Sequence, residues 1–142
     1  MYVADAKRLT LAGAKKIMAT ALARAEAEKI AVSIAIVDAG GHLVLLERME
    51  GGKFHTVHSA TTKAVCAASS RQLTAAKGAQ GQGLDVAHAL GLALAAGAER
   101  WTAMEGGCPV MAGAECIGGV GVAGGNWEFD ERVAKEAADS IR

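Results

Sequence analysis

The hydrophobic positions near the start of the chain change their period once, from that of a helix to that of a strand. Thr10 is a typical helix N-cap, and the apolar and small residues after it recur at helical spacing until the segment ends near Lys29. In residues 31–37 the apolar side chains alternate with a period of two, and residues 42–48 form a return strand. The Asp-Ala-Gly-Gly turn at 38–41 suits a tight reversal. The pattern therefore predicts an amphipathic helix followed by a β-hairpin.

The remaining elements follow in an order that indicates the fold class. They are predicted as helices at 57–70, 72–77 and 84–96, strands at 101–104, 109–111 and 116–123, and a last helix capped by Asn126. In the helix at 84–96, Asp85 lies in the first turn, where a carboxylate is favourable to the helix dipole. Strands and helices do not alternate one by one, which argues against a doubly wound parallel sheet. We therefore expect an α+β fold, an antiparallel sheet of about five strands flanked by helices.

Composition bears on size and assembly. The 142 residues suffice for a single domain spanning 1–142, and 51% of them are hydrophobic. Only 4% are aromatic, so the core is expected to consist mainly of small side chains that each bury little area. Self-association would bury more apolar surface. We therefore expect a homo-oligomer, a dimer or a larger assembly.

Charge and the length of apolar runs exclude several kinds of partner. The 15 basic and 15 acidic residues cancel without any run of like charge, so no positive stripe is available for a nucleic acid backbone. The apolar stretches are too short to span a membrane, and the charged N-terminal segment is unlike a secretory signal peptide. We expect no nucleic acid partner, no membrane association and a cytoplasmic location.

The cysteines and one glycine motif are candidates for chemistry that have plainer explanations. Cys66, Cys108 and Cys116 form no CxxC pair and are expected to be free, mostly buried thiols, with Cys108 as the candidate for a catalytic thiolate. Residues 119–124 spell GxGxxG, but the printed sequence ends at Arg142 without the later parallel strand that a dinucleotide site needs. We interpret these glycines as positions that admit a neighbouring backbone or a ligand.

Four motifs in a fixed order resemble a known family. They are residues 37–44 with 47–49, residues 62–64, residues 105–110, and residues 117–125 followed by Glu128 and Asp130. Together they resemble the GlcG/HbpS-like haem-degrading family and are similar to the C-terminal domain of PduO-type cobalamin adenosyltransferases. The resemblance implies a profilin-like α+β fold and homo-oligomers. It also implies haem binding or degradation, which is attached to some members of the family.

The four histidines differ in how well their positions suit haem binding. His55 and His58 are three residues apart at a helix start, so a helical turn places both rings on one side. Either could ligate haem iron while its second ring nitrogen donates to an acceptor, or both could be partly exposed residues at a helix entry. His42 is expected to face solvent beside the hairpin turn. His88 is expected to be a hydrogen-bonded core or interface histidine.

Two basic side chains could anchor an anionic ligand. Lys63 lies in a small and apolar helical face, where a buried ammonium needs a partner. Asp38, Glu47 and Glu105 are the candidate partners for a structural ion pair, and a ligand carboxylate or propionate is the alternative. Arg48 is similar, because its planar fork suits a bidentate carboxylate.

A glycine turn completes the predicted site. Gly106 and Gly107 would let a flat ligand lie against the backbone with free N–H groups as donors. Glu105 could act as a general acid or base if burial raised its pKa, or the segment could be a tight turn with peripheral charges. The predicted pocket is lined by Arg48, Met49, Lys63, Gly106 and Gly107.

The sequence therefore leaves two functions open. The first is a small-ligand-binding protein that binds haem or a related tetrapyrrole and degrades it as an additional activity, with His55 or His58 as the iron ligand. The second is a cofactor-free, lyase- or isomerase-like catabolic enzyme for a small carboxylated, aromatic metabolite. There Lys63 or Arg48 would anchor the carboxylate, and His58 or Glu105 would move protons. A purely structural role is a third reading, so whether the protein is an enzyme stays open.

Overall fold

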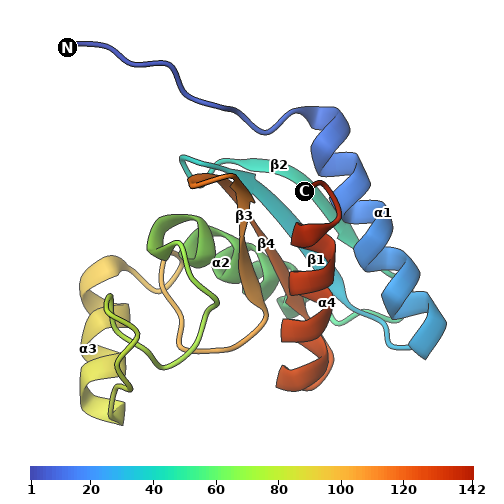
Figure 1. Cartoon of the computed structure of the whole chain (residues 1–142). Coiled ribbons are helices and arrows are strands. Elements are labelled where there is room, and N and C mark those ends of the chain that lie inside the picture. Colours follow the sequence, from blue (N-terminus) through green and yellow to red (C-terminus); the bar gives the residue numbers. More distant parts are fainter.

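The computed structural model describes residues 1–142 and contains four helices and one four-stranded sheet (Figure 1). The elements are α1 (Leu11–Glu28), β1 (Ser33–Asp38), β2 (Leu43–Arg48), α2 (His55–Ser70), α3 (Val86–Ala96), β3 (Gly107–Ala112), β4 (Glu115–Ala123) and α4 (Trp127–Asp139). The strand order is β2-β1-β4-β3, and every neighbouring pair is antiparallel. The predicted α+β class is confirmed. None of the helices is both long and apolar enough to cross a membrane.

Helices cover the two faces of the sheet unequally. The main core of 19 buried residues lies between the sheet and the pair α1 and α4, and it receives Ile34 and Ile36 from β1. The alternate residues of that strand, Ala35 and Val37, join a smaller cluster of mostly alanines beneath α2. Figure 1 shows α2 on the opposite side of the sheet from α1 and α4. Successive side chains of β1 thus point to opposite faces of the sheet and pack into two different cores.

Two glycines of β4 allow α2 to lie directly on the sheet. A Cβ atom on Gly119 would overlap the carbonyl oxygen of Ala64, and one on Gly121 would overlap that of Ala60. Both carbonyls belong to the backbone of α2. The interpretation of the GxGxxG run as a close backbone approach is therefore confirmed.

Short polar side chains begin three of the helices, and two of these caps, Thr10 and Asn126, agree with the prediction. Thr10 Oγ1 accepts a hydrogen bond from the Gly13 N–H at 3.0 Å, and Asn126 Oδ1 accepts one from Phe129 at 2.8 Å. Asp85 accepts one from the His88 N–H at 2.8 Å. Asp85 is therefore the N-cap of α3 and not a residue of its first turn, so this helix begins at Val86.

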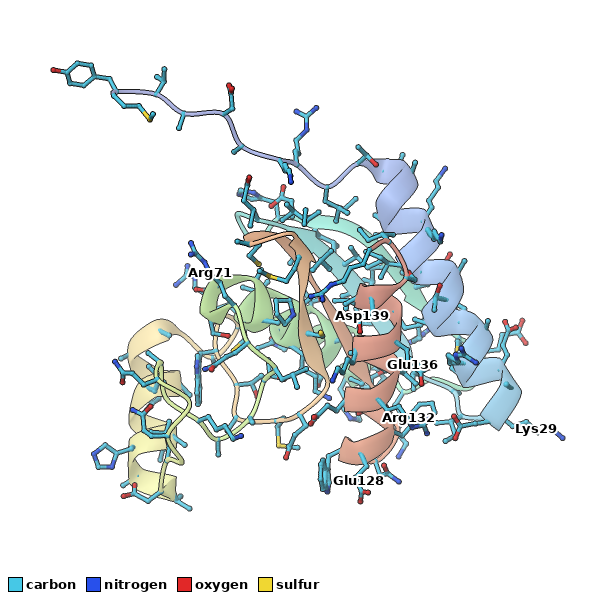
Figure 2. The ribbon with its side chains drawn as sticks, viewed as in Figure 1. Lys29, Arg71, Glu128, Arg132, Glu136 and Asp139 are labelled. Carbon is cyan, nitrogen blue, oxygen red and sulfur yellow. The ribbon has the colours of Figure 1, made fainter.

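Charged pairs on the outside connect α1 with α4. Arg132 and Glu136 project from α4 (Figure 2), and they pair with Glu28 at 2.9 Å and with Arg24 at 2.8 Å. Pairs that are this exposed add little to the stability of a fold, because water and salt screen their attraction. They orient the two helices, whereas the buried apolar residues beneath hold them.

Two predicted elements are absent, and the sheet has four strands instead of about five. Residues 72–77 are not a helix, because their backbone groups bond to distant partners: the Thr74 N–H donates to Gly107 O, and the Leu84 N–H donates to Ala76 O. Residues 101–104 are not a strand, because the Trp101 N–H donates back to Gly97 O. In both segments long-range or turn hydrogen bonds satisfy backbone groups that a helix or a sheet would otherwise pair.

Candidate functional site: an amphipathic cleft beside α2

A buried ion pair lies at the centre of the candidate site. Lys63 on α2 is 6% exposed, and its Nζ donates to Val122 O at 2.9 Å and lies 3.3 Å from Asp130 Oδ2. The other carboxylate oxygen of Asp130 accepts the Gly125 N–H at 3.0 Å. Burial raises the pKa of Asp130, although the Lys63 ammonium opposes this shift. A structural ion pair for Lys63 is thus confirmed.

The partner of Lys63 differs from the three that the sequence suggested. Asp38, Glu47 and Glu105 do not pair with it, and Asp130 in the first turn of α4 does. These two residues are 67 positions apart in the chain. The sequence signals for Asp130 are its place in the fourth of the family-like motifs and its position in the first turn of a helix, where carboxylates are common for the dipole alone.

The Gly-Gly turn packs against the same lysine. Gly106 has a φ of 120°, and a Cβ there would lie 2.9 Å from Lys63 Nζ, so glycine is needed both for conformation and for space. A Cβ on Gly107 would overlap the carbonyl oxygen of Lys63. The structure therefore packs Lys63 against Gly106 and Gly107, but neither glycine is among the residues that line the two cavities beside Lys63, so their role in ligand binding stays a prediction. The Gly107 N–H is not free for a ligand, because it donates to Thr74 Oγ1 at 2.8 Å.

An apolar cavity of about 520 Å³ opens between α2, α3 and the segment before β3. Its lining residues are His58, Ser59, Thr62, Lys63, Ala76, Leu84, Asp85, Val86, Ala89, Leu90, Ala93, Ala98, Trp101, Thr102, Ala103 and Met104. Several of them, Val86 and Met104 included, are exposed, so the cavity is open to solvent. His58 and Met104 are the side chains in this wall that can ligate haem iron.

A polar cavity of about 290 Å³ adjoins the apolar one. Ser59, Lys63 and Met104 line both, so the two spaces meet at this boundary. The other residues of the polar wall are Lys53, His55, Thr56, Glu105, Ala123, Gly124, Gly125, Trp127 and Asp130. We call the two spaces together the amphipathic cleft. It can hold a molecule with an apolar body and a polar edge.

The two predicted iron ligands, His55 and His58, lie on different walls of this cleft. His55 lines the polar cavity and His58 lines the apolar one. Residues three apart on a helix differ by about 60° in direction, which is enough to send the two rings to different spaces. No cluster of three or more metal-binding side chains forms anywhere in the chain.

Arg48 and Met49 lie outside the cleft. Arg48 ends the edge strand β2 as an exposed side chain, and Met49 packs against the main core. Neither residue lines the apolar or the polar cavity. Of the predicted basic anchors, the structure thus places Lys63 at the cleft and Arg48 away from it.

For the other two histidines, His42 and His88, the predicted and observed positions agree in one case and differ in the other. His42 is exposed, and its Nδ1 lies 3.2 Å from Asp38, which confirms the solvent-facing position. His88 is exposed as well and lies 2.9 Å from Asp85. It is therefore hydrogen-bonded as predicted. Its place in the core is wrong, and its place at an interface stays a prediction.

The cysteines are free, and Cys66 and Cys108 are buried. Burial raises the pKa of Cys108 to about 12, which leaves almost no thiolate at neutral pH. We expect the folded protein to resist iodoacetamide at pH 8 at Cys66 and Cys108, whereas unfolded protein reacts at all three cysteines. Peptide mass spectrometry checks this, and rapid alkylation of native Cys108 would contradict it.

Sequence reasoning missed Lys53, Trp101, Met104 and the whole of α3 as parts of the cleft. One signal was available. Residues 86–96 contain no Asp, Glu, Lys or Arg, although surface helices of a small protein normally carry them. An uncharged helix next to a Trp–Met segment indicates an apolar wall.

The comparisons with known proteins agree with this architecture. The chain belongs to the family described as "Haem degrading protein HbpS-like", whose model matches residues 9–139. It is 31% identical over 137 residues to an uncharacterized 15.0 kDa protein of the dhaT-dhaS intergenic region in Citrobacter freundii, covering 92% of this chain and 90% of that one. It is also similar to Klebsiella pneumoniae protein ORFY, with 31% identity, a TM-score of 0.85, and coverage of 99% and 96%. The PduOC:haem complex is 24% identical with a TM-score of 0.81, covering 96% of each chain, and shows a shared fold.

Proposed function

We propose that this protein binds haem or a related tetrapyrrole in the amphipathic cleft. The observation that carries the proposal is the junction of an apolar cavity of about 520 Å³ with a polar one at Ser59, Lys63 and Met104. A tetrapyrrole of this kind is a flat apolar ring with carboxylates along one edge. Ligand cavities of a few hundred Å³ with mostly apolar walls and a few polar groups are typical of cofactor sites.

The apolar wall fits the ring and its iron. His58 on α2 and Met104 before β3 supply the side-chain types that serve as axial ligands. Leu90 and Ala93 of α3 and the Trp101 ring provide apolar surface. When bound, haem supplies an iron centre for electron transfer or oxygen chemistry.

The polar wall fits the carboxylate edge. Lys63 is already neutralised by Asp130, so the positive charge free for a ligand comes from Lys53 and from His55 when it is protonated. The Glu105 carboxylate lines the same space, and a ligand carboxylate is therefore expected on the Lys53 and His55 side. His55 thus has the role of an anchor in this proposal, and His58 has that of the iron ligand.

The family and one of the similar structures support haem as the kind of ligand. The description of its model names haem degradation, and PduOC has been solved with haem. We restrict the proposal to binding, because the shape and polarity of the cleft bear on binding and on no reaction step. The alternative enzyme for a small carboxylated metabolite has weaker support, since its candidate anchor Lys63 is already paired with Asp130 and its other candidate anchor Arg48 lies outside the cleft.

A hemin titration tests the proposal and separates the two histidines. We expect a saturable Soret shift at one hemin per chain. His58→Ala should move the position of the Soret band and lower the affinity for hemin by about tenfold or more. His55→Ala should weaken binding without moving the Soret band, because it removes an anchor and leaves the ligand. His42→Ala is the matched control, since it removes an exposed histidine outside the cleft.

Three results would contradict the proposal in different ways. The absence of a saturable shift would overturn haem binding in the cleft. A Soret position unchanged by His58→Ala but moved by Met104→Ala would assign the iron to Met104. Equal loss in His42→Ala and His58→Ala would indicate binding by surface histidines, without a cleft.

A further inference from the structure

A further cavity, larger than either part of the amphipathic cleft, lies next to it. It has a volume of about 670 Å³ and opens between the β1–β2 turn, α2 and the chain that follows α3. It shares His58 and Trp101 with the apolar cavity and no residue with the polar one. We call it the turn cavity. Its volume is typical of sites for small organic molecules, and the proposed haem site leaves it unused.

Three separate parts of the chain form the walls of the turn cavity. Gly40 and Gly41 give the wall at the β1–β2 turn no side chains. At the end of α3, Gly97 has a φ of 106°, and the chain turns there toward α2. Figure 1 shows this segment returning beside α2, where Cys66 Sγ donates to Thr102 O at 3.7 Å. The space is therefore bounded by turns of defined backbone conformation and by a helix.

One cation with unused donors lines the turn cavity. Arg100 Nη1 donates to Ala96 O at 3.4 Å, whereas the carboxylate of Glu99 lies 3.8 Å away, beyond hydrogen-bond distance. The Arg100 and Glu99 side chains are 69% and 58% exposed, so their attraction is weak, in contrast to the buried pair of Lys63 and Asp130. Most of the five guanidinium N–H groups thus remain available, and their planar fork suits a carboxylate held by two parallel hydrogen bonds.

The rest of the wall suits a ligand with an apolar body. Half-buried Val65 and Trp101 supply apolar surface, and the Trp101 ring can pack against a second ring. Thr61 and Ser69 add hydroxyl groups on the same side of α2 as Val65, because these three residues are spaced by four. A small organic carboxylate, with one charged end and an apolar ring or chain, matches this set of groups.

We propose that the turn cavity binds a small organic carboxylate through Arg100, and that the bound carboxylate strengthens His58 as an iron ligand. The first part is independent of the proposed function, whereas the second rests on it. His58 lines both the turn cavity and the apolar cavity. An anion near a ligating histidine favours the N–H on its second ring nitrogen and raises its basicity. By linkage, the carboxylate and hemin should then raise each other's affinity by the same factor.

Trp101 fluorescence tests the carboxylate site without haem. In a Trp127→Phe background, Trp101 is the one remaining tryptophan. We expect sodium benzoate to change its emission saturably, with benzyl alcohol and benzylamine at least tenfold weaker. Arg100→Gln should lower benzoate affinity about tenfold, because it removes the charged fork. Arg48→Gln is the matched control, since Arg48 is an exposed arginine that lines none of the three cavities.

A filling variant separates the turn cavity from the cleft. Ser69 is exposed on α2 and lines neither part of the amphipathic cleft. Ser69→Phe should abolish benzoate binding by occupying the turn cavity and should leave hemin affinity in the absence of benzoate unchanged. Circular dichroism should show the same fold in this variant and in the wild type.

A hemin titration with and without benzoate tests the coupling. In the wild type, saturating benzoate should raise hemin affinity about fivefold. In Arg100→Gln and in Ser69→Phe, the same addition should leave hemin affinity unchanged.

Each outcome decides a different part. No saturable response to benzoate, an equal response to benzylamine, an equal loss in Arg48→Gln and Arg100→Gln, or full binding in Ser69→Phe would overturn the carboxylate site. Displacement of hemin by benzoate would place the carboxylate in the cleft and overturn it as well. Benzoate binding with unchanged hemin affinity would overturn the coupling. Benzoate binding in a protein that binds no hemin would support the site and contradict the proposed function.

Discussion

Replacing Asp130 with alanine is expected to lower the free energy of unfolding by about 3–5 kcal/mol. The substitution leaves the Lys63 ammonium buried with only the Val122 carbonyl as a partner, and it also removes the acceptor of the Gly125 N–H. A buried charge without its counter-charge has the largest cost of any polar defect in this core. Urea unfolding followed by circular dichroism measures the loss. Glu128→Ala is the control, because Glu128 is an exposed carboxylate in the same helical turn and should change stability by less than about 1 kcal/mol.

The double variant Lys63→Met/Asp130→Leu is expected to recover most of that loss. Burial raises the pKa of Asp130 even beside Lys63, which means that desolvation of this carboxylate outweighs its attraction to the ammonium. Apolar side chains of similar size avoid the desolvation, and such replacements of buried pairs are often neutral or stabilising. A double variant as unstable as Asp130→Ala would show that the pair stabilises the fold by itself.

Gly121→Ala is expected to destabilise the protein by about 3 kcal/mol or more, and Gly121→Val should prevent folding. The added Cβ overlaps the Ala60 carbonyl oxygen, which belongs to the backbone of α2 and cannot rotate away. The whole helix would have to move off the sheet, which would open the alanine cluster between them. Thermal and urea unfolding both report the loss.

Gly83→Ala is the matched control for this glycine. The same methyl group at Gly83 meets nothing within 4 Å, and we expect a change within about 0.5 kcal/mol. If the two variants were equally stable, α2 would have room above β4. The close packing of helix on sheet would then not be a source of stability.

The predicted elements that are correct are those whose determinants are local. The hairpin of β1 and β2 follows from a period of two on either side of a glycine turn, and the caps Thr10 and Asn126 bond within their own helical turn. The elements predicted wrongly are short. Residues 72–77 and 101–104 have patterns compatible with helix and strand, but their backbone groups bond to Gly107, Leu84 and Gly97 instead. Short segments carry too few positions for periodicity to outweigh such contacts.

The sequence predicted some residues of the candidate site, but it did not predict how they are arranged in space. Lys63 and the Gly106-Gly107 turn do meet, because a lysine in an alanine-rich face and a double glycine are both unusual enough to indicate a special environment. The direction of each histidine depends on where the facing loop lies, and the sequence does not contain that information. The apolar half of the cleft depends on α3, whose position is decided by two long connections.

By itself the sequence determined the starts of α1 and α4, the hairpin, the α+β class and the need for close packing, since each rests on neighbouring residues or on side-chain size. Only the tertiary structure decided which carboxylate neutralises Lys63 and which cavity each histidine lines. The physical reason is separation along the chain. Lys63 and Asp130 are 67 residues apart, and nothing in either local pattern encodes their meeting. Contacts of that kind arise only when the sheet assembles and brings α2 and α4 to the same end of β4.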